Sequence, residues 1–216
     1  MDARPVVYLV DDDESVLVAL TRVLRLDGYE VRSRTSAREF LADHDPEVVG
    51  CLVCDLVMPA MNGLELQREL EIRGLYRSIV FLTGQGDLRS AVKGMKAGAV
   101  TFLSKPVTHQ ELLSAIREAV HQDRATRERE RERMAVEQRL LTLTPRERQV
   151  LELVAAGLLN KQIAAKLGIA EKTIKIHRGR VMGKMRVSSV AALVGLLAPL
   201  ARGKLGHPLS GRGTEA

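Results

Sequence analysis

Carboxylates follow two apolar runs in the first half of the chain, each with the composition of a strand. Asp11 and Asp12 come directly after Val6 to Val10, and Asp55 comes directly after Val48 to Cys54. A turn is one interpretation of Asp55, because Asp favours turns and a proline follows four residues later. If the two strands end side by side, however, the three carboxylates repel one another unless a cation neutralises them. Oxygen ligands suit Mg²⁺, so the pattern favours a magnesium site.

Two further polar side chains follow apolar runs in the same half of the chain. Thr83 ends the run SIVFLT, and Lys105 follows the run TFLS. Each has a plain alternative, because threonine is common in strands and lysine is common anywhere. Together with the acids they form a coherent set, in which a cation organises a phosphoryl group on Asp55. Lys105 would then pair with that group, and Thr83 would donate a hydrogen bond to it.

The elements that position these residues are five short β-rich runs, PVVYLV, YEVRS, VVGCLVC, SIVFL and TFLS, within residues 5 to 120. Helical patterns such as ESVLVALTRVLRL lie between them. This alternation predicts a doubly wound α/β domain with a five-stranded parallel sheet, in which ligands bind at the carboxyl ends of the strands. No glycine-rich phosphate-binding motif follows the first run, which argues against nucleotide binding.

The segments VDDD, CDLVMP, NG, LTG, KAGA and FLSKP, in this order, resemble the receiver domain of two-component response regulators. The resemblance implies that Asp55 accepts a phosphoryl group from a sensor histidine kinase. It also implies that Asp12 binds Mg²⁺ directly, that Asp11 assists partly through water, and that the backbone carbonyl of Val57 is a third ligand.

The same resemblance assigns a conformational switch to three residues. Thr83 and Lys105 are the switch residues, and Phe102 matches the aromatic residue that moves when Thr83 engages the phosphoryl group. An aspartate-dependent phosphatase is the enzymatic alternative, but such enzymes need a carboxylate two residues after the nucleophile. Val57 occupies that position, so we expect no enzymatic activity.

Charge separates the chain into parts. The 216-residue chain has a net charge of +6, and Lys and Arg outnumber Asp and Glu by ten to three in residues 144 to 200. Such a basic domain indicates a polyanionic partner. Two cysteines, Cys51 and Cys54, support neither a disulfide framework nor a zinc site. The chain has no pattern of an export signal or a membrane span, and we expect a cytoplasmic location.

Alternating Arg and Glu mark residues 121 to 143 as a connector. Like charges at i,i+4 and opposite charges at i,i+3 nearly cancel, so a solvated linker is one interpretation. A helix that continues from the preceding domain is the other, because Arg, Glu, Ala and Met are good helix formers. A coiled coil is disfavoured, since residues 121 to 133 have no apolar seam. We expect a helical linker.

Residues 144 to 200 predict four helices. Thr144, Pro145 and Glu147 predict the start of the first helix with a capping box, and Asn160 is the expected cap of the second. The basic stretch EKTIKIHRGRVMGKM follows a short turn, which indicates a helix-turn-helix domain.

The basic stretch has two faces at helical spacing. Ile174, Val181 and Met185 are expected to point inward. The residues expected to point outward are Lys172, Lys175, Ile176, Gly179 and Arg180. A solvated basic face is the plain alternative for any one lysine, but the charge of the whole domain favours DNA.

The segments TPRERQVL, GLLNKQIA, LGI and TIKIH resemble the output domain of LuxR-type regulators, and the whole chain resembles the NarL/FixJ family. The resemblance implies base contacts from Lys175 and Ile176. Residues implied at or near the DNA backbone are Lys172, Thr173, His177 and Arg178. Two positions depart from the pattern. Ala170 replaces a Ser or Thr cap, and Gly179 replaces a longer side chain that contacts a base. Arg180 is expected to supply a base contact in its place.

The resulting hypothesis is a transcriptional regulator with a receiver domain at 1–120, a linker at 121–143, a DNA-binding domain at 144–200 and a disordered tail at 201–216. Phosphorylation is expected to produce a homodimer that binds promoter DNA and interacts with RNA polymerase. The closing helix VAALVGLLAPL is more apolar than a small domain needs, so two copies are expected to pair there. A protein that binds DNA independently of phosphorylation is the alternative.

Overall fold

The computed structural model describes residues 4–84 and 99–203, and the chain divides into two compact units, Met1–Arg127 and Glu128–Ala216. The expected fourth helix and most of the KAGA motif lie outside the described residues, as does the tail from residue 204 onward. The two units are therefore treated one at a time.

A five-stranded parallel sheet forms the centre of the first unit and confirms the predicted fold class. Its strands are β1 (Val6–Val10), β2 (Glu30–Arg34), β3 (Gly50–Asp55), β4 (Ser78–Thr83) and β5 (Thr101–Ser104). They are arranged in the order β2-β1-β3-β4-β5. Because Val10 on β1 pairs with Cys54 on β3, the next residues, Asp11 and Asp55, emerge side by side at the carboxyl edge.

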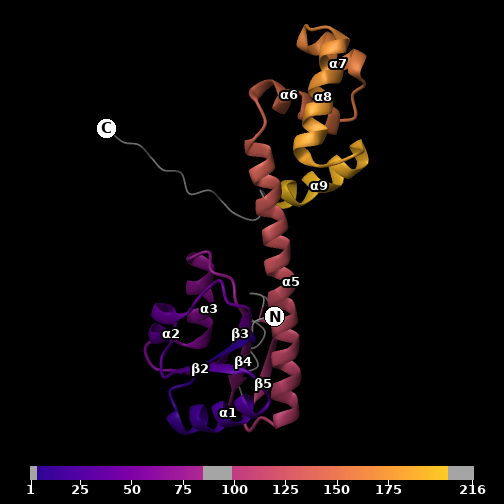
Figure 1. Ribbon diagram of the computed structural model, residues 1–216. Helices are drawn as coiled ribbons and strands as arrows, with labels where there is room; N and C mark the ends of the chain where they lie inside the picture. Colours follow the sequence, from indigo (N-terminus) through magenta and orange to yellow (C-terminus); the bar gives the residue numbers. More distant parts are fainter. Residues whose placement is uncertain (1–3, 85–98, 204–216) are drawn as a thin grey trace, which may run out of the picture. The chain divides into compact units, whose positions relative to one another are not determined.

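Helices cover both faces of this sheet (Figure 1), because successive residues of a strand point to opposite sides. The described helices are α1 (Glu14–Leu26), α2 (Ala37–Asp43), α3 (Gly63–Ile72) and the first part of α5 (His109–Leu141). Val7 and Leu9 pack in one core with α1 and α5. Tyr8 and Val10 pack in the other core with α2 and α3. Both faces are apolar, as the continuous apolar runs predicted.

The two cysteines lie in different cores. Cys51 packs on the α1 and α5 side of the sheet, and Cys54 packs on the α2 and α3 side. Both are free and fully buried, and burial raises the pKa of the Cys51 thiol to about 12. Cys51 and Cys54 thus lie on opposite sides of the sheet and are not joined to each other.

The second unit contains the end of α5 and the helices α6 (Pro145–Ala155), α7 (Asn160–Leu167), α8 (Glu171–Met185) and α9 (Val190–Gly203). The capping box of α6 is confirmed: the amide of Glu147 donates to Oγ1 of Thr144 over 3.2 Å, and the amide of Thr144 donates to Oε2 of Glu147 over 2.9 Å. Gly168 ends α7 in the left-handed conformation, with φ of 65°.

The predicted cap of α7 is wrong. Leu159 occupies the cap position, and its amide donates to Oε1 of Gln162 over 2.8 Å. Asn160 is instead the first helical residue, and its Oδ1 accepts a hydrogen bond from Arg178 on α8. The side chain of Asn160 thus connects two helices of the module.

The connector is helical, which confirms one of its two interpretations: α5 is a single helix of 33 residues. Among residues 4–84 and 99–203, no single helix is long and apolar enough to cross a membrane. In the part of the chain that the structure describes, one pair, α8 and α9, passes such a test together, across a bend of 56°.

Candidate functional site

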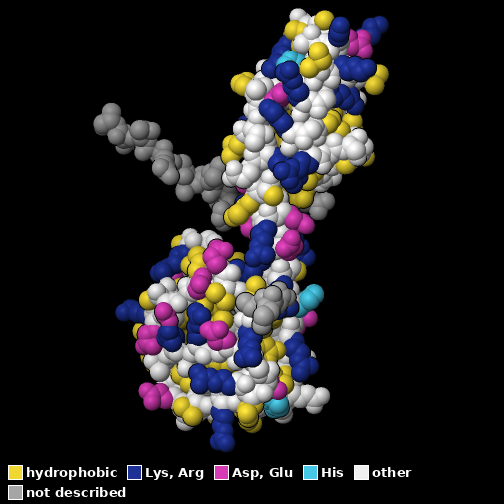
Figure 2. All heavy atoms as spheres, viewed as in Figure 1, with side chains coloured by type: hydrophobic (Ala, Val, Ile, Leu, Met, Phe, Trp, Pro, Cys, Tyr) yellow, Lys and Arg dark blue, Asp and Glu magenta, His cyan; other side chains and the backbone are white. Residues whose placement is uncertain are grey.

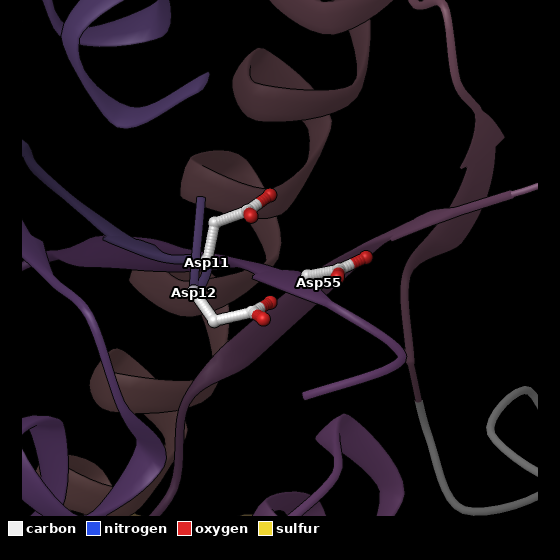
Figure 3. A group of neighbouring side chains, drawn as sticks. All are labelled: Asp11, Asp12 and Asp55. Carbon is white, nitrogen blue, oxygen red and sulfur yellow. The ribbon is translucent and has the colours of Figure 1, made fainter. Parts of the chain in front are cut away.

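The three predicted carboxylates meet at the carboxyl edge of the sheet. One oxygen from each of Asp11, Asp12 and Asp55 lies within 4.8 Å of the others. Asp11 and Asp55 are 2% and 8% exposed, whereas Asp12 is open to solvent. Figure 3 shows the side chains of Asp11 and Asp12 extending toward the side on which Asp55 lies. This set of oxygen donors has the chemistry of a magnesium site.

Lys105 balances part of this negative charge. Its Nζ lies 2.7 Å from Oδ2 of Asp11 and 3.2 Å from Oδ1 of Asp55. Burial lowers the pKa of Lys105, but the hydrogen bond to Asp11 and the two negative charges outweigh burial, so its pKa is raised. Burial raises the pKa of the Asp55 carboxyl, and Lys105 opposes that rise. One cation therefore faces three carboxylates.

Gly63 is required by the turn that follows Asp55. A Cβ at Gly63 would lie 2.7 Å from the backbone oxygen of Asp55 and 2.8 Å from Cε1 of Phe81. Asn62 caps α3 in a capping box with Glu65, which fixes the end of the loop. The backbone at Asn62 and Gly63 thus lies close to that of Asp55, an approach that the missing side chain of Gly63 allows. Within this loop the side chain of Val57 is 66% exposed and supplies no carboxylate.

Thr83, one of the two expected switch residues, and the expected mobile aromatic Phe102 lie on neighbouring strands. Thr83 ends β4, and its hydroxyl donates to the carbonyl of Gly84 over 3.2 Å. Phe102 on β5 is half-buried and stacks on Phe81, with ring centroids 4.9 Å apart and planes inclined by 29°. The hydroxyl of Thr83 thus has a partner other than Asp55.

Asp13 and Glu14 belong to the start of α1, as the sequence indicated. Asp13 is the cap residue, and its Oδ1 accepts hydrogen bonds from the amide and the hydroxyl of Ser15. These hydrogen bonds lower the pKa of Asp13. Two of the four consecutive acids therefore stabilise a helix, and the other two face the site.

The faces of α8 are arranged as predicted in the second unit. Ile174, Val181 and Met185 are fully buried. The side chains exposed to solvent include Lys172, Thr173, Lys175, Ile176 and Arg180. Figure 2 shows basic side chains gathered over α7 and α8, with few acidic ones among them. A basic, exposed helix face is suited to a DNA groove.

Two of the predicted DNA-binding residues are only partly exposed. Arg178 is half-buried and donates from Nη1 to Oδ1 of Asn160 over 3.0 Å. His177 is also half-buried, and its Nδ1 is a buried atom without a partner in the described chain. Contact with the DNA backbone stays a prediction for both.

Lys161 and Lys166 were missed by the sequence analysis. Both are exposed on α7, and neither makes a hydrogen bond or ion pair with the described residues. The signal was present in NKQIAAKL, where two lysines interrupt an otherwise apolar and neutral helix. In a helix-turn-helix the first helix crosses the DNA backbone, so these lysines add to the candidate phosphate contacts.

Comparison with known proteins identifies both units. Residues 7–117 match the family described as response regulator receiver domain. Residues 141–197 match the family described as bacterial regulatory proteins, luxR family. The receiver implies a histidine kinase as partner, and the helix-turn-helix implies DNA.

Several proteins are similar over nearly the whole chain. Nodulation protein W of Bradyrhizobium diazoefficiens is 47% identical over 191 residues, which cover 88% of this chain and 84% of that protein. Response regulator protein TodT of Pseudomonas putida is 44% identical over 196 residues, covering 89% and 85%. The solved structure of response regulator StyR has a TM-score of 0.79 at 45% identity, covering 91% and 100% of the two chains. Full-length FixJ from B. japonicum has a TM-score of 0.57 at 34% identity, covering 93% and 98%.

A receiver followed by a helix-turn-helix defines a response regulator with a DNA-binding output domain. The chain belongs to the NarL/FixJ family of these regulators, which are transcription factors and not enzymes.

Proposed function

We propose that this protein is a phosphorylation-controlled transcription factor that accepts a phosphoryl group on Asp55 from a sensor histidine kinase. The observation that supports this proposal most strongly is the cluster of Asp11, Asp12 and Asp55 with Lys105 beside it. Three acids around one cation leave a net negative charge that is costly without a metal ion. A receiver without this chemistry would have no need of such a cluster.

The residues present fit Mg²⁺, because the cluster offers only oxygen donors. Asp11, Asp12, Asp55 and the backbone carbonyl of Val57 would hold the ion. When bound, the ion neutralises charge on the phosphoryl oxygens. A carboxylate oxygen of Asp55 attacks phosphorus, and the bond between phosphorus and the donor histidine nitrogen breaks, leaving the electron pair on that nitrogen. Lys105 then pairs with the phosphoryl group.

In the proposed switch, Thr83 turns its hydroxyl from the carbonyl of Gly84 to the phosphoryl group. Phe102, stacked on Phe81, moves with it. The change would reshape the surface near β5 and α5 and favour a homodimer. Two copies would also pair through α9, where Val194 is 44% exposed, and read half-sites about one helical turn apart or closer.

The proposed DNA interface is the exposed face of α8, with Lys175, Ile176 and Arg180 at base edges and Lys172, Thr173, His177 and Arg178 at or near the backbone. RNA polymerase is a further proposed partner, because it binds at the same promoters as the regulator. Because promoter DNA lies in the cytoplasm of bacteria, we propose a cytoplasmic location.

Phosphorylation with acetyl phosphate and Mg²⁺ tests the proposal. Intact-mass measurement should show one added phosphoryl group on the wild type and on Asp13→Asn, a matched control that keeps the cap of α1. Asp55→Asn should show none. Sedimentation should then show a larger mass for the phosphorylated wild type at micromolar concentration. Phosphorylation of the Asp55→Asn variant would contradict the assignment of Asp55 as the phosphoacceptor. If the sedimentation mass and the DNA affinity of the wild type both stay unchanged after phosphorylation, a phosphorylation-independent regulator is favoured.

A further inference from the structure

The C-terminal end of α8 is hydrogen-bonded to residues that precede the helix-turn-helix. Arg139, near the end of α5, donates from Nη1 to the carbonyl of Met185, the last residue of α8, over 3.3 Å. Lys184 donates from Nζ to the carbonyl of Thr142 over 2.9 Å and to Oε2 of Glu147 over 2.6 Å. Three hydrogen bonds thus join the end of α8, the proposed recognition helix, to the end of α5 and the start of α6.

Packing places the end of α5 in the same structural module. Val136 and Leu143 are 5% and 7% exposed, and they share one core with Ile174 and Val181 of α8. The hydroxyl of Thr142 donates back to the carbonyl of Arg139 over 2.7 Å, which closes the helix end. The last two turns of α5 are therefore built into the DNA-binding unit.

Among the described residues, no side chain forms a capping hydrogen bond at the other end of α8, where the attachments are the buried Ile174 and the hydrogen bond from Arg178 to Asn160. Ala170 occupies its cap position and makes no capping hydrogen bond. Cations near a helix C-terminus also interact favourably with the backbone dipole and the free carbonyls there. Because a helix behaves as a rod, a small tilt at Met185 moves residues 172 to 176, which lie about 14 to 20 Å away along the axis. Those residues are the ones predicted to contact base edges and phosphates.

Lys184 differs from the lysines available to DNA. Its partner Glu147 has a side chain only 4% exposed, and the hydrogen bond from Lys184 lowers the pKa of that carboxyl. Lys172 and Lys175, in contrast, are exposed and have no hydrogen-bond or ion-pair partner among the described residues. The ammonium of Lys184 is thus committed within the protein.

We propose that Arg139 and Lys184 are positioning residues for DNA recognition. By joining the C-terminal end of α8 to α5 and α6, they set the orientation in which the recognition helix enters the groove, and they do not contact DNA themselves. This inference rests on the proposed DNA-binding role of α8.

The test uses the full-length phosphorylated protein and a fluorescein-labelled duplex that the wild type selects from a random-sequence library. Arg139→Met and Lys184→Met should each weaken binding to this duplex by about tenfold, because a charged hydrogen bond that orients the helix is lost. Binding to a shuffled duplex, and the slope of log affinity against log salt, should stay unchanged. Lys184→Arg, which still reaches Glu147, should restore affinity. Arg131→Met is the matched control for Arg139→Met, since Arg131 also lies on α5 and its side chain is 69% exposed.

Other results would overturn the inference. A salt slope reduced by about 0.9, as expected for Lys172→Met, would show that Lys184 contacts a phosphate. Unchanged affinity, or equal weakening on both duplexes, would remove the positioning role. If circular dichroism shows that Lys184→Met is unfolded, Glu147→Gln replaces it, because glutamine keeps an acceptor for the amide of Thr144 and removes the charged pair. If the wild type selects no duplex, the DNA-binding proposal itself fails.

Discussion

The ammonium nitrogen of Lys105 lies 3.2 Å from Oδ1 of Asp55, so a cation from the end of β5 already accompanies the proposed phosphoacceptor. The same nitrogen lies 2.7 Å from Asp11. Lys105 and a bound Mg²⁺ would therefore act on the same carboxylates. Their charges are of the same sign, so each should weaken the binding or pairing of the other.

Calorimetric titration with Mg²⁺ should separate the two effects. Asp12→Ala should weaken binding by about tenfold or more, because it removes an oxygen ligand. Lys105→Met should strengthen binding several-fold, because it removes a competing positive charge. Asp13→Asn is the control and should leave affinity unchanged. Full affinity in Asp12→Ala would mean that the metal site has been misplaced.

Acid should destabilise the first unit through His44. Burial, and then the charge of Arg77, lower the pKa of His44 from 6.5 to about 4. Between pH 6.5 and about pH 4, His44 is therefore protonated in the unfolded chain but neutral in the folded chain. Because the unfolded state binds the extra proton, the free energy of unfolding decreases as pH falls through this range. From pH 7 to pH 5 the loss is about 2 kcal/mol.

Urea unfolding at pH 7 and pH 5 measures this effect. His44→Gln cannot be protonated in this range, so its stability should fall by about 2 kcal/mol less than that of the wild type. His121→Gln removes an exposed imidazole from α5 and should behave like the wild type. An identical pH dependence in His44→Gln and the wild type would exclude this explanation.

Asp123 should anchor the first part of α5 to the sheet. It is fully buried, and its Oδ2 accepts hydrogen bonds from the amide of Gly50 over 3.0 Å and from Nε of Arg127 over 2.6 Å. Asp123→Ala leaves both donors without this partner and should cost about 2 to 3 kcal/mol of stability. The exposed Glu118 on the same helix supplies the control, Glu118→Ala. Hydrogen exchange at Gly50 should accelerate in Asp123→Ala alone, and an equal effect of both variants would contradict the anchor.

The sheet and the carboxylate site could be predicted because strand period and strand ends are local signals. A continuous apolar run identifies a strand buried on both faces, and the parallel order brings Asp11 and Asp55 to one edge. The faces of α8 followed from helical period in the same way, since Ile174 and Val181 are both buried as expected.

The features that were missed depend on contacts between distant residues. Asn160 has the composition of a cap, but its side chain is held by Arg178, and Gln162 satisfies the amide of Leu159 instead. Asp123 falls on the apolar stripe of α5, seven residues after Ile116, yet nothing in its neighbours indicates that Gly50 is its partner. A charge on an apolar stripe is the signal that could have found it.

Lys175 provides the sharpest test of the recognition helix. It is exposed near the start of α8, about 100° around the helix axis from the buried Ile174, where a helix enters a major groove most deeply. Lys175→Ala should weaken binding to a specific site by about 1 to 3 kcal/mol and relax the preference at one base position. Lys172→Ala should instead weaken all sequences alike and reduce the salt slope by about 0.9, because phosphate contacts act through counterion release. Footprinting and anisotropy titrations compare the two variants on the same duplex. Equal protection by Lys175→Ala and the wild type would remove α8 from base recognition, and a single unpaired half-site would exclude the proposed dimer on DNA.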